Sequence, residues 1–201
     1  MRCKPLARPL IVAVGVLALV ASACGESATT GSAQETADLH RFLIRADEMP
    51  GFPLRGEPDL VSDLSAFVES DDLDQAQEQR LREHGFEAFT AQMIGDPEGE
   101  AGVSNLTLFA TQAGAARELE YLRNNKEKEA PPEIENFERF DVPDVPTAFG
   151  WTYVKPGGSR TADIQWLQGR CVMYLGSEPA YIDRLRAAVK AIYEHTGGRC
   201  P

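Results

Sequence analysis

The stretch AFGWTYVKPGGSRTADIQWLQGRCVMYL, residues 148–175, predicts three consecutive strands joined by two tight turns. Within the strands, aromatic and aliphatic residues recur at every second position, the period of a strand with two different faces. Residues 156–159 and 169–170 contain the glycine and proline that hairpin turns favour. This segment therefore predicts an antiparallel sheet.

The same order of elements occurs twice. Residues 86–94 and 103–110 predict an earlier strand pair, and Thr111 is a good N-cap for the helix that follows. Ser177 is expected to cap a last helix with an apolar stripe of Ile182, Leu185, Val189 and Ile192. Aligning Thr111 with Ser177 suggests two ββα-type units.

With a further candidate strand at 136–142, the sequence predicts an α+β fold. We expect one antiparallel sheet of about five to six strands, with helices packed mainly on one face.

The segments outside this pattern are expected to be less regular. Apolar residues at helical spacing predict a helix over 36–49, which Pro50-Gly51-Phe52-Pro53 ends. Residues 54–70 are expected to be irregular. Asp71 or Asp72 is a candidate cap for a short helix through about His84, and residues 126–133 are expected to form a charged loop.

The N-terminus has the three-part layout of a secretory signal. Three basic residues precede the apolar run 10–20, and Ala21-Ser22-Ala23-Cys24 follows it. The run is shorter than the roughly 20 residues that a membrane-spanning helix needs. Residues 25–36 are small and polar, as in a flexible tether. We therefore expect a signal peptide at 1–23, a tether at 24–36 and a single domain at 37–201.

Cys24 directly follows small residues, and this arrangement resembles the lipobox of bacterial lipoproteins. In that family the cysteine thiol is diacylglycerated, and cleavage leaves the modified cysteine at the N-terminus. The resemblance implies lipidation of Cys24, with acyl chains such as palmitate, and a location on the extracytoplasmic face of the cell membrane. The alternative is an ordinary signal peptide cut after Ala23, with Cys24 free.

Two further cysteines are candidates for a disulfide. Cys3 leaves with the signal, so Cys171 and Cys200 remain in an exported, oxidising setting. The last strand leaves Cys171 and the last helix returns in the opposite direction, which brings Cys200 back to the end of the sheet where Cys171 lies. We expect these two residues to be paired.

The charge balance argues against two classes of partner. The chain has 20 basic and 31 acidic residues, and loss of residues 1–23 removes three basic residues and no acid. The remaining net charge, near −14, disfavours nucleic acid and anionic lipid head groups as partners.

Motifs for catalysis or metal binding are not visible. His40, His84 and His195 are not at metal-ligand spacing, and no G-x-S-x-G or phosphate-binding loop occurs. Residues 56–79 contain eight acids, but their spacing does not match a calcium loop. A solvated acidic face with helix-capping aspartates is preferred to calcium. We therefore expect no enzyme, no metal and no cofactor.

A set of aromatic residues on neighbouring predicted strands has two interpretations. It comprises Phe149, Trp151, Tyr153, Trp166 and Tyr174. The set either forms the core under the helices, which we favour, or lines a ligand groove that would include Trp151, Tyr153 and Trp166.

Several segments resemble those of lipoproteins from high-GC Gram-positive bacteria. They are EMPGF (48–52), LREHGF (81–86), LFATQAGAARELE (108–120) and VPDVPTAFG (142–150). The helix-then-sheet layout with a disulfide is also similar to the extracellular sensor domains of some actinobacterial receptor kinases. These resemblances imply a non-enzymatic envelope role.

The function expected from the sequence is that of a membrane-anchored, non-catalytic binding or sensing module. Its partners would be the membrane, through Cys24, and an envelope protein or small ligand. The alternative is an envelope protein that handles lipids or lipoproteins through a hydrophobic groove.

Overall fold

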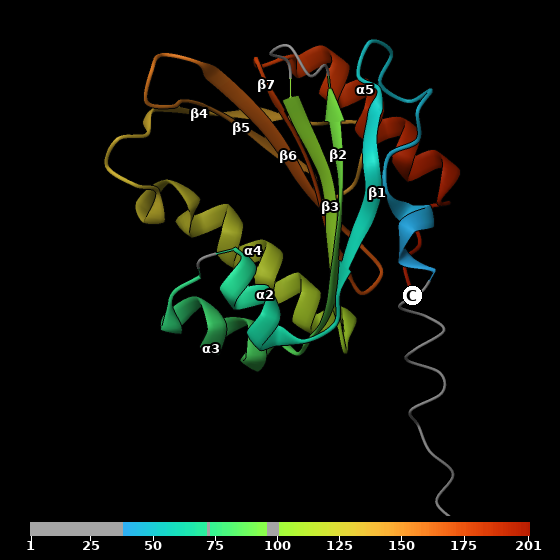
Figure 1. The fold of residues 1–201 in the computed structure, drawn as a ribbon, viewed down its shortest axis with the longest axis vertical. Helices are drawn as coiled ribbons and strands as arrows, with labels where there is room; N and C mark the ends of the chain where they lie inside the picture. The colour runs from blue at the N-terminus through green and yellow to red at the C-terminus, as the bar shows by residue number, and fades with distance from the viewer. Residues whose placement is uncertain (1–37, 72, 96–100) are drawn as a thin grey trace, which may run out of the picture.

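The computed structural model describes residues 38–71, 73–95 and 101–201. The predicted signal peptide, Cys24 and the predicted tether lie outside these residues. Within the described part, one antiparallel sheet has the strand order β1-β2-β3-β7-β6-β5-β4 (Figure 1). The strands are β1 (Leu54–Val61), β2 (Phe86–Gly95), β3 (Ala101–Phe109), β4 (Glu135–Asp141), β5 (Phe149–Val154), β6 (Arg160–Gln168) and β7 (Cys171–Glu178).

The α+β class is confirmed, but the described sheet has seven strands rather than five or six. The strand that the sequence did not predict is β1, in the segment expected to be irregular. Its pairing with β2 is interrupted between Arg55 and Asp59, and Pro58 lies within that interruption. Proline and irregular pairing are tolerated at a sheet edge, and they hide the period of two in the sequence.

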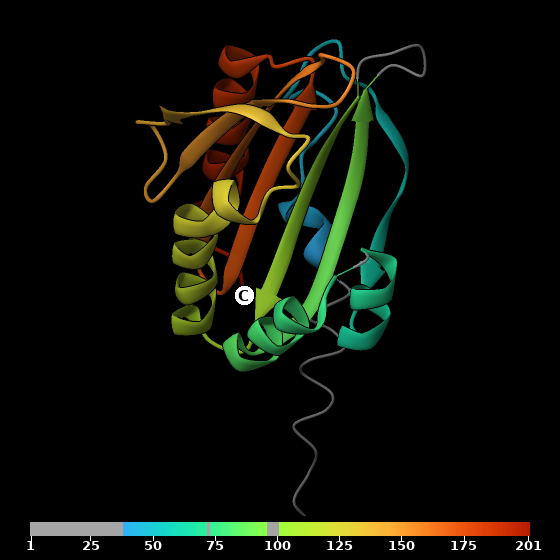
Figure 2. The ribbon, with the colours of Figure 1, turned by 90° about the vertical axis from the view of Figure 1, so that its left-hand side faces the viewer.

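The helices divide between the two faces of the sheet (Figure 2). One face carries α2 (Leu64–Ser70), α3 (Gln75–His84) and α4 (Gln112–Glu129), and the other carries α5 (Ile182–His195) and the 3₁₀ turn η1 (Leu39–Phe42). Three of the four described α-helices thus lie on one face, and α5 lies on the other. The two ββα units therefore share their order but not the side on which their helices pack.

Each face has its own apolar core because successive strand residues point to opposite sides. On β7, Met173 belongs to the core under α5, whereas Val172 belongs to the core under α4. Trp166 is fully buried in the first core, and Phe149 is nearly so in the second. The sheet thus separates two cores.

Thr111 caps α4 as predicted, since its side chain accepts a hydrogen bond from Gly114 N. Asp71 is not the N-cap of a helix but the C-cap residue that follows α2, and Asp72 lies outside the described residues. Asp74 caps α3 instead, in a capping box with Gln77. The sequence placed this cap too early because three neighbouring aspartates compete for it.

Other boundaries also differ from the prediction. Ser177 does not cap the last helix, because β7 continues to Glu178 and α5 begins at Ile182. Helix α4 extends to Glu129, into the first half of the expected loop. A helix was expected over 36–49, but its described residues contain only the 3₁₀ turn η1, and the backbone is extended again at Leu43. Leu39, Phe42, Leu43 and Met49 are nevertheless buried, so an irregular backbone buries the apolar side chains that a helix was expected to bury.

Candidate ligand-binding site

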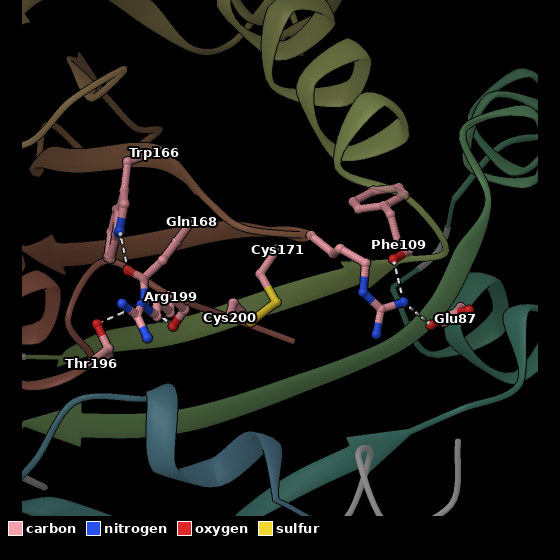
Figure 3. The surroundings of a disulfide bond; sticks show 9 residues. Glu87, Phe109, Trp166, Gln168, Cys171, Thr196, Arg199 and Cys200 are labelled. Atoms are coloured by element: carbon pink, nitrogen blue, oxygen red, sulfur yellow. Dashed lines mark hydrogen bonds and ion pairs between the residues drawn. A yellow bond between two sulfur atoms is a disulfide. The ribbon is translucent and has the colours of Figure 1, made fainter. Parts of the chain in front are cut away.

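The disulfide between Cys171 and Cys200 joins the first residue of β7 to the segment after α5, with a Cα–Cα distance of 5.9 Å (Figure 3). Gln168 supports the same segment, because its Nε2 donates to Thr196 Oγ1 at 2.7 Å and to the carbonyl of Arg199 at 2.8 Å. Trp166 Nε1 in turn donates to Gln168 Oε1 at 3.1 Å. The end of the chain is thereby fixed to the sheet.

A groove of about 660 Å³ lies on the α4 side of the sheet, beyond the part that the helices cover. Its floor comes from alternate residues of the central strands, among them Ala91, Val103 and Gly176. These side chains are small or absent, which explains why the surface is hollow here. The volume is within the usual range for small-molecule sites.

One large apolar side chain lines this groove without being covered. Met93 on β2 is 46% exposed and shares the face of Ala91 and Phe89. Exposed apolar surface gathered in a concavity is typical of a binding site rather than of a free surface. The apolar part of the groove therefore lies toward the β1 edge of the sheet.

A buried ionic cluster lies next to the groove, under α4. Lys126 on α4 forms an ion pair with Asp163 on β6, and Asp163 has no exposed surface. The Lys126 ammonium also lies 5.4 Å from the ring centre of Tyr153 and 5.6 Å from that of Tyr174. Both tyrosines line the groove, so the cluster forms one of its walls.

Burial governs the protonation of this cluster. It raises the pKa of Asp163, and the Lys126 ammonium opposes that shift. Burial also raises the pKa values of Tyr153 and Tyr174, and the charge of Asp163 adds to the increase. Both hydroxyls therefore stay protonated at neutral pH, and they interact with each other and with Asp163.

Gly176 positions Tyr174. A Cβ atom at position 176 would lie only 2.6 Å from the Tyr174 hydroxyl oxygen, so only glycine leaves room for that hydroxyl. Gly176 is paired with Asp163 in the β6–β7 register. The sequence contained this signal as a glycine inside a strand, but the prediction ended the strand just before it.

The face of β6 toward α4 carries three unsatisfied oxygen atoms. Thr161 Oγ1, Asp163 Oδ1 and Gln165 Oε1 have no hydrogen-bond partner in the described structure. All three residues are at least nine-tenths buried. They are alternate residues of one strand, so their side chains share one face. Buried oxygens without partners are rare in folded proteins and require an explanation.

An ion pair lies at the same end of the groove as Thr161. Lys155 Nζ is 2.7 Å from Glu178 Oε2, and this hydrogen bond lowers the pKa of Glu178. The Glu178 carboxylate also interacts with the Thr161 hydroxyl, although the two do not form a hydrogen bond of normal geometry. The polar end of the groove thus combines hydroxyl groups with a paired carboxylate.

The three residues named as a groove from the sequence are in different places. Tyr153 lines the groove. Trp151 packs in the second core against Phe137, with ring centres 6.0 Å apart. Trp166 lies on the opposite face, in the first core. The aromatic pattern located the strands correctly but could not show which face was left open.

Two of the histidines and two of the acids noted in the sequence connect or cap elements of the fold. His84 Nδ1 lies 2.8 Å from Glu118 Oε2 and ties α3 to α4, while His195 pairs with Glu48 at the other face. Asp63 and Asp74 cap helices. Over the described residues, no group of three or more histidine, cysteine or acidic side chains converges as a metal site would require.

The sequence matches no protein-family model and no curated protein. Among solved structures, the fold is similar to that of the extracellular domain of PknH from Mycobacterium tuberculosis, with a TM-score of 0.55 and 14% identity. The match covers 81% of this chain and 96% of that domain. At this identity the likeness shows the fold. None of the helices in the described part of the chain has the length and apolar composition needed to cross a membrane.

Proposed function

We propose that this protein is a non-catalytic ligand-binding or sensing module on the extracytoplasmic face of the membrane, and that the groove is its ligand site. The observation that carries the proposal is the combination of an uncovered apolar surface with unsatisfied buried oxygens beside it. A ligand that fills the groove would cover Met93 and supply a hydrogen-bond partner to Thr161. Both features are costly in an empty protein.

A binding role fits the chemistry of the wall better than catalysis. Lys126 is committed to Asp163, and Tyr153 and Tyr174 have raised pKa values that keep them protonated. None of these groups is therefore prepared to act as a base at neutral pH. They are suited to orient a ligand.

The proposed location rests on three separate features. The lipobox-like residues around Cys24 predict a lipid anchor, and the Cys171–Cys200 disulfide favours an oxidising compartment. The fold likeness to an extracellular domain agrees with both. Replacing Cys24 by alanine tests the anchor. The variant should leave the membrane fraction and lose incorporated fatty acid, and retention of both would contradict the proposal.

The groove is tested by titration with N-phenyl-1-naphthylamine, which fluoresces in apolar surroundings. We expect saturable binding at one site. Ala91→Trp would place an indole on the floor of the groove and should abolish binding, whereas Ala113→Trp, at an exposed position of α4, should not. Equal binding by both variants, or none by the wild type, would contradict the assignment of the groove.

Lipid handling is the second candidate, and the exposure of Met93 in the groove favours it. A carrier must accept and release a lipid, whereas a sensor needs only to bind. Transfer of a fluorescent lipid between two vesicle populations separates these functions. Acceleration by the wild type and not by Ala91→Trp would support the carrier.

A further inference from the structure

The unsatisfied atoms on β6 can all accept hydrogen bonds. Asp163 Oδ1 and Gln165 Oε1 accept hydrogen bonds, and Thr161 Oγ1 both accepts and donates. Of these residues, Thr161 lines the groove directly. A hydrogen-bond donor at the polar end of the groove would therefore pair with Thr161 Oγ1.

The charges around the groove also favour a ligand that carries hydrogen-bond donors. Among the described residues, its lining contains the carboxylates of Asp59, Asp71 and Glu178 and one amine, that of Lys155. That amine is held by Glu178 at 2.7 Å, so it does not offset the other two carboxylates. The second amine nearby, Lys126, is likewise paired with Asp163. A negatively charged head group would find both amines already paired and two carboxylates opposing it.

We propose that the groove takes a cationic amphiphile, with its apolar part against Val61 and Met93 and a primary ammonium at Thr161 and Glu178. This assignment rests on the groove being a ligand site. An ammonium has three donors and a positive charge, so it bridges the Thr161 hydroxyl and the Glu178 carboxylate, which do not form a hydrogen bond of normal geometry with each other. An alcohol brings one donor and no charge, and a carboxylate brings no donor and a negative charge.

Three ligands with the same ten-carbon chain test the head group. Decylamine, decanol and decanoate compete with the fluorescent probe at pH 7, below their micelle concentrations. We expect decylamine to bind about tenfold more tightly than decanol, the factor typical of a hydrogen bond to a charged group. Decanoate should bind most weakly. Equal affinities, or tighter binding of decanoate, would overturn the proposal.

Variants locate the head group. Thr161→Val removes the hydroxyl with little change in shape and should reduce the preference for decylamine over decanol severalfold. Thr107→Val is the matched control, because Thr107 lies on the same face of the sheet but outside the groove. An unchanged preference in Thr161→Val, with its thermal unfolding unchanged, would overturn the placement.

The two levels of the proposal fail differently. If the probe does not bind at all, the groove is not a ligand site and the proposed function fails. If the probe binds and Ala91→Trp abolishes its binding, but the three ligands compete equally, only the cationic assignment fails.

Discussion

Gly176 lies directly opposite Asp163 in the pairing of β6 with β7, and the hydroxyl of Tyr174 occupies the space that a side chain at position 176 would need. Because Gly176 has no side chain, Tyr174 on the same strand can extend toward the buried carboxylate of Asp163 on β6. The wall of the groove depends on this fit.

Gly176→Ala should disrupt the wall. The added Cβ would lie 2.6 Å from the Tyr174 hydroxyl oxygen, which must then move. We expect a loss of about 1–3 kcal/mol in the free energy of unfolding, the usual cost of overpacking, measured by urea denaturation. Adding Tyr174→Phe removes the closest atom and should restore part of the loss. A double variant no more stable than Gly176→Ala would show that the contact is not the cause.

Removing the partner of Asp163 should cost more. Lys126→Met keeps the length of the side chain but leaves a carboxylate with no exposed surface unpaired. Breaking one side of a buried ion pair typically costs about 3–5 kcal/mol. Urea denaturation at pH 7 measures this cost. In the double variant Lys126→Met/Asp163→Asn no charge is left unpaired, so much of the stability should return. A loss below 1 kcal/mol in Lys126→Met would contradict the buried pair.

The raised pKa of Asp163 sets the sign of a pH dependence. The native protein holds the Asp163 proton more tightly than the unfolded chain does. This contribution to stability is therefore fully present below the ordinary aspartate pKa, about 3.9, and is lost as the pH rises through the raised value. Asp163→Asn should remove this component. Relative to the wild type, this variant should become more stable, with a larger free energy of unfolding, as the pH rises from 4 to 7. A constant difference over this range would contradict the shift.

Local patterns were enough to predict much of the sheet. The alternation in residues 148–175 predicted β5, β6 and the start of β7, and the pattern at residues 86–110 predicted the β2–β3 pair. Alternation was informative there because each strand is bounded by clear turn residues. At β1 the same signal was lost to Pro58 and to an exposed edge.

The groove was beyond reach of the sequence for a different reason. Its existence depends on how far α2 and α4 extend over the sheet, which is a matter of packing between segments distant in the chain. Of the residues that define it, only Tyr153 was named as a groove residue, and Trp166, named with it, turned out to lie on the other face. Asp163 and Lys126 carried no motif, because an isolated buried pair has no characteristic spacing.

Removal of the disulfide should weaken the domain without changing the groove. Cys171 and Cys200 are 29 residues apart in sequence, and a closed loop of this size stabilises a fold by about 3–4 kcal/mol in the chain-entropy model. The bond lies on the α5 face, whereas the groove is on the α4 face. The double variant Cys171→Ala/Cys200→Ala should therefore unfold at lower urea concentration but bind the fluorescent probe with unchanged affinity under native conditions. Dithiothreitol should weaken the wild type similarly and leave the variant unaffected. Loss of probe affinity in the folded variant would show that the two faces are coupled through the sheet.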